Sequence, residues 1–594
     1  MTDLQFGPVI SDRGVTFRLW APLVDNIRLK LEDHEPLPMR QLADGWHELE
    51  LAGAGAGALY RFVLPDGLQV PDPASRFQPH DVHGFSEVED LANYDWKEEA
   101  WRGRPWEETV LYELHIGTFT EEGTFLAAIG RLDHLARLGV TVIQIMPVAD
   151  FPGRYGWGYD GVLPYAPDSS YGRPEHLMAL VDAAHERGIS VFQDVVYNHF
   201  GPDGNYLPLY APVFTDRHKT PWGKGIDYDG AMARPMREFA IQNAIYWITT
   251  FKMDGLRLDA VHAINDCSEE HLLLELARRV RAAAAAADRH VHLIVENEEN
   301  DSDLLKRTSD GATTLFTAQW NDDIHHTLHV AATGERFGYY ADYAEDSEAL
   351  ARSLAEGFVF QGQHMPYRGE SRGKSTSELP PTAFVSFIQN HDQIGNRAMG
   401  DRIIAAQPVD VMKAMAAVYL LAPQIPMLFM GEDWGARDAF PYFCDLNEEL
   451  NEMVRNGRRE ELSRLPGFDT DDLLDPTAPS TFEMAKLDWS NLTEPESADM
   501  HDFYTSLLAT RHQKIVPLLA DMRRGEIVAG SGFTVVAVDW RLASGGRLCL
   551  RANLGDEAIA LEPATDEAEA IFGLVASSGS KLSPWSVYWS VRRE

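Results

Sequence analysis

Four short acidic motifs follow one another along the chain, each at the end of an apolar run typical of a buried strand. They are Asp194-Val-Val-Tyr-Asn-His199, Gly255-Leu-Arg-Leu-Asp259, Ile294-Val-Glu296-Asn and Ile388-Gln-Asn-His-Asp392. Carboxylates are costly to place beside apolar strands unless they are paired or hydrogen-bonded. Several that converge on one site therefore indicate catalysis rather than stability. One chemistry that converging carboxylates perform is cleavage of a glycosidic bond, and we take hydrolysis of an α-glucosidic bond as the hypothesis.

The second motif places an arginine and a carboxylate on one face of a strand. Side chains alternate along a strand, so Arg257 and Asp259 share a face while Leu256 and Leu258 point to the other. An arginine within about 4 to 6 Å lowers an aspartate pKa by roughly 1 to 3 units. We therefore expect Asp259 to be ionised and able to attack an anomeric carbon. A structural ion pair is the alternative interpretation, because ion pairs also perturb pKa values.

The third motif offers a general acid. Glu296 ends the apolar run of residues 291–295, so partial desolvation should raise its pKa and keep a proton available for a leaving-group oxygen. Taken alone, Glu296 could equally be a surface residue in an acidic cluster with Glu298 and Glu299. The other three motifs favour the catalytic role.

Polar and aromatic residues around these carboxylates are candidates for holding a sugar chain. Histidines beside Asp392 and Asp194 would supply hydrogen-bond partners for ring hydroxyls. In the segment 157–160, the faces of Tyr159 and, less strongly, Trp157 suit stacking against a pyranose ring. The predicted substrate-binding residues are Tyr159, Asp194, His199, Arg257, His262, Trp320, Asp322 and His391.

The elements that must position these residues divide the chain into three parts. Residues 1–95 alternate apolar and polar side chains in short runs separated by turns, which predicts an amino-terminal β-sandwich. Residues 96–515 alternate apolar strands with helical segments, which predicts a (β/α)8 barrel of the α/β class. Residues 516–594 return to short strands, which predicts a carboxy-terminal β domain.

Eight strand-helix units are expected in the barrel. The strands are predicted over residues 111–116, 140–146, 190–196, 255–259, 292–296, 315–320, 383–388 and 427–430, with helices such as 125–138, 174–187, 236–251 and 409–421 between them. In a barrel of this kind the active residues lie on loops after the strands, where all four motifs occur. The stretch 201–235 is too long for an ordinary connection, and we expect it to be an excursion that shapes the cleft.

Composition narrows the functional class. A formal charge of -39 without a basic cluster argues against binding to nucleic acid or to an anionic membrane, and a neutral substrate suits it better. The cysteines, only Cys267, Cys444 and Cys549, are too widely separated for a disulfide framework or a CxxC metal site. The amino terminus lacks the pattern of a signal peptide, and no run of about 18 apolar residues follows. We therefore expect a cytoplasmic protein.

Across roughly residues 110–510 the four motifs resemble those of the α-amylase superfamily of retaining glycoside hydrolases, and the preceding sandwich is similar to that of glycogen-acting members. The resemblance implies a nucleophile at Asp259 and an acid/base at Glu296. It also implies that Asp392 is a further carboxylate, which grips ring hydroxyls and stabilises the transition state. The reaction would be a double displacement that retains the anomeric configuration.

The same resemblance implies that Arg257, His199 and His391 line the subsites. It implies no metal or organic cofactor, although Asn198 occupies a position that contributes to calcium binding in some related amylases.

Within the superfamily, local signatures resemble the members that release trehalose from malto-oligosyltrehalose by cutting the adjacent α-1,4 bond. These signatures are Leu111–Thr120, Tyr197–Tyr206, Gln319–His326, Arg455–Glu461 and Thr481–Trp489. The implied pathway partner is malto-oligosyltrehalose synthase.

Two alternatives stay open at the level of sequence. A glycogen branching enzyme has a similar sandwich and barrel but transfers the glycosyl group to a sugar hydroxyl; Gln393 weighs against it, because branching enzymes carry an acidic residue after the aspartate. An inactive carbohydrate-binding barrel is the other alternative. Retention of every expected carboxylate argues against it.

Overall fold

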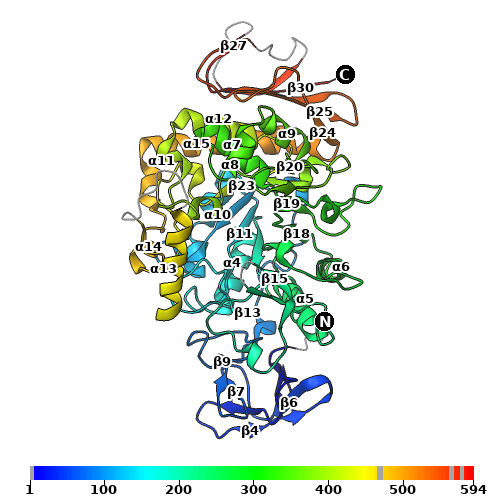
Figure 1. The fold of residues 1–594 in the computed structure, drawn as a ribbon, viewed down its shortest axis with the longest axis vertical. Helices are drawn as coiled ribbons and strands as arrows, with labels where there is room; N and C mark the ends of the chain where they lie inside the picture. Colours follow the sequence, from blue (N-terminus) through cyan, green and yellow to red (C-terminus); the bar gives the residue numbers. More distant parts are fainter. Residues whose placement is uncertain (1–5, 221–222, 464–472, 561–567, 575–580, 594) are drawn as a thin grey trace.

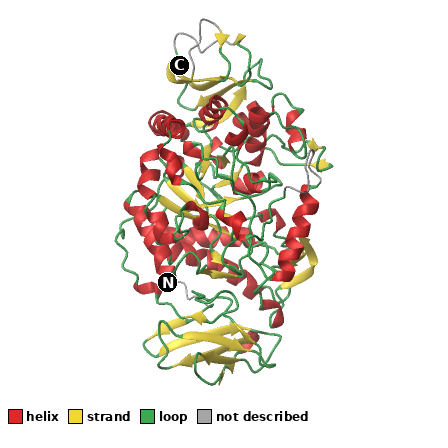
Figure 2. Ribbon diagram, turned by 90° about the vertical axis from the view of Figure 1, so that its left-hand side faces the viewer, coloured by secondary structure: helices red, strands yellow, loops and turns green. Residues whose placement is uncertain are grey.

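The molecule is elongated, with β-sheets at both ends and a barrel between them. The computed structural model describes residues 6–220, 223–463, 473–560, 568–574 and 581–593. In Figure 1 the amino-terminal sheets lie at the bottom, the barrel in the middle and the carboxy-terminal sheet at the top. The view in Figure 2 shows the same arrangement. The predicted fold class, a (β/α)8 barrel flanked by β-rich parts, is confirmed.

Two antiparallel sheets form the amino-terminal end. One has the order β1-β2-β6-β5, and the other has the order β4-β3-β7-β8 with β9 beside β7. The strands are β1 Val9–Ser11, β2 Gly14–Trp20, β3 Arg28–Leu31, β4 Leu37–Pro38, β5 Arg40–Gln41, β6 Trp46–Leu51, β7 Leu59–Val63, β8 Gln69–Val70 and β9 Ser86–Glu87. Alternate side chains point between the sheets, as period-two patterning requires. Phe17 of β2 and Tyr60 of β7 meet there with ring centroids 4.7 Å apart.

Eight parallel strands close the barrel, and the first pairs with the last. Their order is β10 Leu111–Leu114, β11 Val142–Ile145, β14 Ser190–Val195, β17 Gly255–Leu258, β18 His292–Val295, β19 Ala318–Trp320, β22 Phe384–Ser386 and β23 Ile425–Phe429. Each overlaps a predicted strand, although β23 begins two residues before the predicted Met427. Nearly every strand residue is buried, because helices cover one face and the barrel interior covers the other.

Helices pack around the barrel, with two departures from the predicted pattern. They are α1 Ile116–Phe119, α2 Phe125–Ile129, α3 Leu132–Leu138, α4 Pro174–Glu186, α5 Arg234–Thr249, α6 Leu272–Ala286, α7 Asp322–Thr333, α8 Tyr340–Ala344, α9 Ala349–Glu356, α11 Ile403–Ala406 and α12 Val409–Tyr419. The helix predicted over 125–138 is split, with Gly130 ending α2. Between β18 and β19, a stretch described throughout, the chain forms only the 3-10 helix η6 Ser302–Leu305. The fifth strand-helix unit therefore lacks its predicted α-helix.

Short additional elements interrupt the connections between the barrel strands. They are the hairpins β12 Ala149–Asp150 with β13 Leu163–Pro167, β15 Phe214–Thr220 with β16 Gly223–Ile226, and β20 His364–Met365 with β21 Glu370–Ser371, and the helix α10 His391–Gly395. After β23 the chain forms α13 Glu448–Leu462, α14 Pro479–Glu483, α15 Pro495–Thr510 and α16 Val516–Leu519. Among the described residues no helix has the length and apolar character needed to cross a membrane.

The carboxy-terminal sheet packs directly on the barrel helices. Its five strands have the order β24 Met522–Ile527, β25 Val535–Leu542, β26 Arg547–Asn553, β30 Ser586–Arg592 and β28 Glu569–Leu574, and a second pair joins β27 Ile559–Ala560 to β29 Lys581–Leu582. The Trp589 indole donates a 2.9 Å hydrogen bond to the carbonyl of Ala417 in α12. Gly525 of β24 lies so close to α9 that a Cβ atom would come within 2.9 Å of Cα of Ala355.

Candidate active site

An open cavity of about 1420 Å³ lies at the carboxyl ends of the barrel strands. Its walls carry carboxylates, histidines, arginines and aromatic rings, a lining suited to a polar ligand with apolar faces. The lining residues are Trp157, Tyr159, Asp160, His199, Arg257, Asp259, Ala260, His262, Glu296, Glu298, His391, Asp392, Asn396, Tyr442, Val454, Arg458 and Glu461. The second, third and fourth motifs predicted from the sequence each contribute their carboxylate to this one cavity.

One guanidinium group contacts two of these carboxylates. Arg257 Nη1 lies 2.9 Å from Asp259 Oδ1, and Arg257 Nη2 lies 2.7 Å from Glu296 Oε2. Arg257 is buried in β17, and its third carboxylate partner is Asp194, 2.8 Å from Nη1. Because Asp259 and Glu296 bind neighbouring nitrogens of one planar group, the two carboxyl groups are close neighbours. Retaining glycosidases likewise use two closely spaced carboxyl groups, whereas inverting enzymes use more widely spaced ones.

Asp259 is held as an anion. It directly follows β17, and its Oδ2 accepts a 2.8 Å hydrogen bond from Asn198 Nδ2. Burial by itself would raise the pKa of Asp259. The charge of Arg257 and the Asn198 hydrogen bond outweigh burial and lower this pKa below its ordinary value. The carboxylate is therefore ionised and suited to act as a nucleophile.

The pKa of Glu296 is shifted in the opposite direction from that of Asp259. Burial, together with the nearby negative charge of Asp259, raises the pKa of Glu296 well above its ordinary value, although Arg257 opposes the shift. Its Oε2 accepts from Arg257 and, at 2.8 Å, from the main-chain N–H of Ala260. Since N–H donors occupy Oε2, a proton on Glu296 is carried by Oε1. Ala260 adopts a left-handed backbone with φ 38°, which is strained for a residue other than glycine and is characteristic of functional sites.

A buried glutamate fixes the segment that carries the third carboxylate. Glu113 of β10 accepts from the main-chain N–H of His391 at 3.0 Å and pairs with its Nδ1 at 2.6 Å. Burial alone would lower the pKa of His391, but the charge of Glu113 raises it overall. Asp392, the next residue, accepts a 2.9 Å hydrogen bond from Asn396, and burial raises the pKa of Asp392.

Aromatic rings form one side of the cavity. Tyr159 stacks on His391 with centroids 5.1 Å apart, and its hydroxyl donates to Asp194 Oδ2 at 2.8 Å. Trp157 meets the His391 ring edge to face at 5.2 Å. Gly395 permits this packing, because a Cβ atom there would come within 2.0 Å of the Trp157 ring. Both aromatic residues predicted from the sequence thus lie at the cavity.

Helix α13 closes another side. Arg458 donates to the carbonyl of Gly395 at 2.6 Å and to Asn396 Oδ1 at 3.2 Å, and it pairs with Glu461 at 3.0 Å. Since Asn396 donates to Asp392, a continuous chain of hydrogen bonds joins α13 to the third carboxylate. The sequence signature Arg455–Glu461 is the segment that supplies these contacts.

Most predicted site residues lie on the cavity wall, but three do not. Asp194 is 2% exposed and binds Arg257 and Tyr159, so it supports the site from behind. Trp320 is 1% exposed, with its ring 4.2 Å from the guanidinium of Arg257. Asp322 is also absent from the lining, although its charge contributes to the raised pKa of Glu296. The predicted contact of these three residues with a substrate therefore stays a prediction.

The excursion 201–235 also lies elsewhere than expected. None of its described residues lines the cavity, and α13 supplies the wall instead.

Sequence reasoning missed Glu113, because a single acidic residue inside an apolar strand carries no spacing signal. It also assigned no role to Arg458, Glu461 and Tyr442, which reach the cavity from segments after β23.

Two groups of described residues could hold a metal ion, and neither lines the cavity. They are His134 with Asp433 and His501, and His218 with Asp229 and Cys267. At the cavity, Asn198 uses its amide nitrogen to bind Asp259.

Comparison with known proteins gives a consistent picture. The family described as "Alpha amylase, catalytic domain" matches residues 78–208, and the "Domain of unknown function (DUF3459)" matches residues 524–589. A malto-oligosyltrehalose trehalohydrolase of Deinococcus radiodurans is 42% identical over 560 residues, which cover 94% of this chain and 90% of the relative. One of Saccharolobus solfataricus is 41% identical over 511 residues, covering 86% and 87%. A crystal structure described as a putative α-amylase of Salmonella typhimurium is 44% identical and superimposes with a TM-score of 0.94, covering 99% and 100%.

Proposed function

The chain belongs to the malto-oligosyltrehalose trehalohydrolases of the α-amylase family, and we propose on this basis that it hydrolyses the α-1,4-glucosidic bond next to the terminal trehalose unit of malto-oligosyltrehalose, releasing trehalose. The observation that carries the proposed chemistry is the Arg257 guanidinium, which contacts Asp259 and Glu296 together. These neighbouring groups have pKa values shifted in opposite directions, one below and one above the ordinary range. Such a pair supplies an ionised nucleophile and a protonated acid at the same pH.

In the first step a carboxylate oxygen of Asp259 attacks the anomeric carbon while the bond to the leaving oxygen breaks. Glu296 gives its Oε1 proton to that oxygen, which leaves as a hydroxyl of the released trehalose, while the malto-oligosyl chain stays on the enzyme. The product at the enzyme is a glycosyl ester of Asp259. Asp392 lies across the same cavity, where its carboxyl group grips ring hydroxyls and stabilises positive charge in the transition state.

In the second step Glu296 acts as a base. Deprotonated in the first step, it takes a proton from water, and the resulting oxygen nucleophile attacks the anomeric carbon. The ester bond breaks, Asp259 regains its charge, and Glu296 regains its proton. Two inversions at the same carbon leave the α configuration unchanged.

The function is tested by product analysis. Purified protein is incubated separately with malto-oligosyltrehalose, plain malto-oligosaccharide and glycogen, and the products are separated by chromatography. Trehalose released preferentially from the first substrate is the expected result. New α-1,6 branches, or equal cleavage of plain malto-oligosaccharide, would instead assign branching or amylase activity. Absence of any product would favour the inactive carbohydrate-binding barrel.

The nucleophile assignment has a separate test. Asp259→Asn should abolish turnover, because an amide oxygen forms no stable ester, while circular dichroism and the unfolding temperature stay close to those of the parent. A fully active variant would contradict the assignment of Asp259.

The proposal also covers the source of the substrate, the cellular location and the domain limits. The substrate would be supplied by malto-oligosyltrehalose synthase, which creates the trehalosyl end. A cytoplasmic location is supported by the three free thiols Cys267, Cys444 and Cys549. We also propose the domain limits 1–95, 96–515 and 516–594, which agree with the change from one set of sheets to the next.

A further inference from the structure

We propose that His218, Asp229 and Cys267 form a binding site for a transition-metal ion that accepts sulfur, nitrogen and oxygen ligands, with Zn²⁺ as its representative. His218 lies in β15, Asp229 follows β16, and Cys267 lies in the loop between η5 (Val261–Ala263) and α6. One ligand atom from each residue lies within 4.8 Å of the other two. The site would therefore join the hairpin β15–β16 to the loop that follows the nucleophile.

The distances suit a small metal ion. Asp229 Oδ2 is the common point: it lies 2.8 Å from His218 Nε2 and accepts a 3.0 Å hydrogen bond from the main-chain N–H of Cys267. Zinc binds sulfur at about 2.3 Å and nitrogen or oxygen at about 2.0 to 2.2 Å, so its ligands stand roughly 3.5 Å apart. An ion between His218 and Asp229 thus requires their ligand atoms to separate by less than about 1 Å. The Cys267 sulfur, within 4.8 Å of both, would have to approach by roughly 1.3 Å at most.

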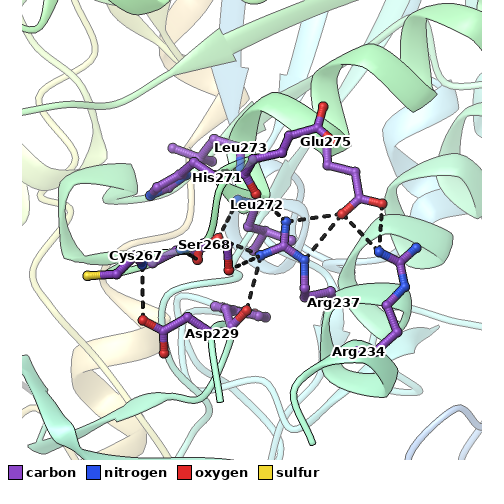
Figure 3. A network of polar contacts seen from close by, with 12 residues as sticks. Asp229, Arg234, Arg237, Cys267, Ser268, His271, Leu272, Leu273 and Glu275 are labelled. Carbon is purple, nitrogen blue, oxygen red and sulfur yellow. Dashed lines mark hydrogen bonds and ion pairs between the residues drawn. The ribbon is translucent and has the colours of Figure 1, made fainter. Parts of the chain in front are cut away.

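One side of the group is open and the other is closed. Cys267 is exposed, whereas the side chains of His218 and Asp229 are 15% and 3% exposed. Figure 3 shows the Cys267 sulfur at the outer edge of the network, with Asp229 beside it. The ion can therefore arrive from solvent and keep a water molecule as its fourth ligand, as zinc sites with three protein ligands do.

A buried arginine holds the surrounding backbone in place. Arg237, 7% exposed, donates to Asp266 at 2.5 Å and to Ser268 at 3.3 Å, the two residues that flank Cys267. It also donates to the carbonyl of Tyr228, the neighbour of Asp229, at 3.0 Å. Two of the three ligands are thus attached to segments bound by one guanidinium group (Figure 3). Second-layer contacts of this kind orient metal ligands before the ion binds.

The charges around His218, Asp229 and Cys267 also suit the binding of a divalent metal ion. Arg217 pairs with Asp229 Oδ1 at 2.5 Å, which leaves Oδ2 to face the ion. Zinc would be bound by one thiolate, one carboxylate and one neutral imidazole. The thiol must lose its proton, so binding releases protons and the affinity rises with pH. Because none of the three residues lines the catalytic cavity, the ion would act on stability and not on the chemical steps.

The test uses Co²⁺ as the probe. The full chain, freed of metal with a chelator and kept reduced, is titrated with Co²⁺, whose bond to a thiolate gives a sulfur-to-metal absorption band. The band should saturate at one equivalent and disappear when Zn²⁺ displaces Co²⁺. Zn²⁺ should also raise the unfolding temperature, since it binds only the folded arrangement.

Two variants and a control decide the result. Cys267→Ser, an exposed replacement, should lose the band and the stabilisation by Zn²⁺, and His218→Gln should weaken Co²⁺ binding by roughly tenfold or more. His501→Gln alters the other candidate cluster, which has no thiol, and should leave the band unchanged. Absence of the band in the parent protein, or an unchanged Zn²⁺ affinity of Cys267→Ser in calorimetry, would overturn the proposal.

Discussion

Asn198 binds Asp259 at two points with a single amide nitrogen. Its Nδ2 donates to the main-chain carbonyl of Asp259 and to Oδ2 of the same residue, 2.8 Å in each case. The bonds fix the carboxylate relative to its own backbone and lower its pKa. The asparagine of the first motif therefore acts on the aspartate of the second.

Replacing Asn198 should move the acid limb of the pH profile. In Asn198→Ala the pKa of Asp259 rises, so the activity lost on acidification is lost at a higher pH, and kcat falls about 10- to 100-fold, as for loss of a hydrogen bond to a charged group. Asn198→Asp should be worse, because a second negative charge raises the pKa of Asp259 further. Profiles of kcat/KM against pH measure both effects. An acid limb that stays in place in both variants would contradict this role.

The basic limb should belong to Glu296. Its acid form is required, so activity falls as the pH rises through its raised pKa. Glu296→Gln should remove this limb and reduce kcat/KM on the natural substrate by about 10² to 10⁴. A malto-oligosyl fluoride needs no protonation of its leaving group, so formation of the glycosyl ester from it should be nearly unaffected in a single-turnover experiment. Equal losses with both substrates would contradict the acid role.

Replacing Glu113 should have an effect on stability that depends on pH. An imidazole whose folded-state pKa is raised adds stability that is complete below its unfolded pKa and disappears as the pH rises through the folded pKa. Burial alone would lower the pKa of His391, and the charge of Glu113 raises it. Glu113→Gln should therefore reduce the unfolding free energy by about 1 to 3 kcal/mol in mild acid and by less in base. Gln144→Met, at the paired position of β11, is the control and should show no such pH dependence. A difference that is constant between pH 5 and pH 9, roughly the span around the ordinary histidine pKa, would contradict this prediction.

Two glycines on neighbouring helices should respond in opposite directions to alanine. At Gly395 an added Cβ would meet the Trp157 ring at 2.0 Å, so Gly395→Ala should cost about 1 to 3 kcal/mol and raise KM by displacing a cavity wall. At Gly457, inside α13, a Cβ would meet nothing within 4 Å, so Gly457→Ala should stabilise by about 0.5 to 1 kcal/mol. Denaturant unfolding measures both. Equal effects would mean that the Trp157 packing does not constrain the site.

The barrel and the three carboxylates that line its cavity were predictable because both follow from local patterns. A parallel strand needs an apolar run, and residues after such strands converge at one end of the barrel. Asp259, Glu296 and Asp392 satisfy both conditions. Their placement therefore required only the order of elements along the chain.

The differences from the predicted site concern contacts between distant parts of the chain. Asp194 lies within β14, one residue before that strand ends, and its carboxylate binds Arg257 without lining the cavity, which strand periodicity alone does not decide. Trp320 has an aromatic ring of the kind that stacks on sugars, but the guanidinium group of Arg257 lies over this ring. Arg458 reaches the cavity from a helix that follows the last strand, so its role depends on a tertiary contact with Gly395. None of these contacts is encoded in the spacing of nearby residues.

The contact between Trp589 and Ala417 bears on how the enzyme can be recombined with its relatives. The Trp589 indole donates to a main-chain carbonyl of the barrel helix α12, and Gly525 lets another strand of the sheet, β24, approach α9. The carboxy-terminal sheet therefore does not form an independent unit. It packs on the barrel helices and covers part of their outer surface. A chimaera that exchanges this sheet would have to exchange the facing surfaces of α9 and α12 with it.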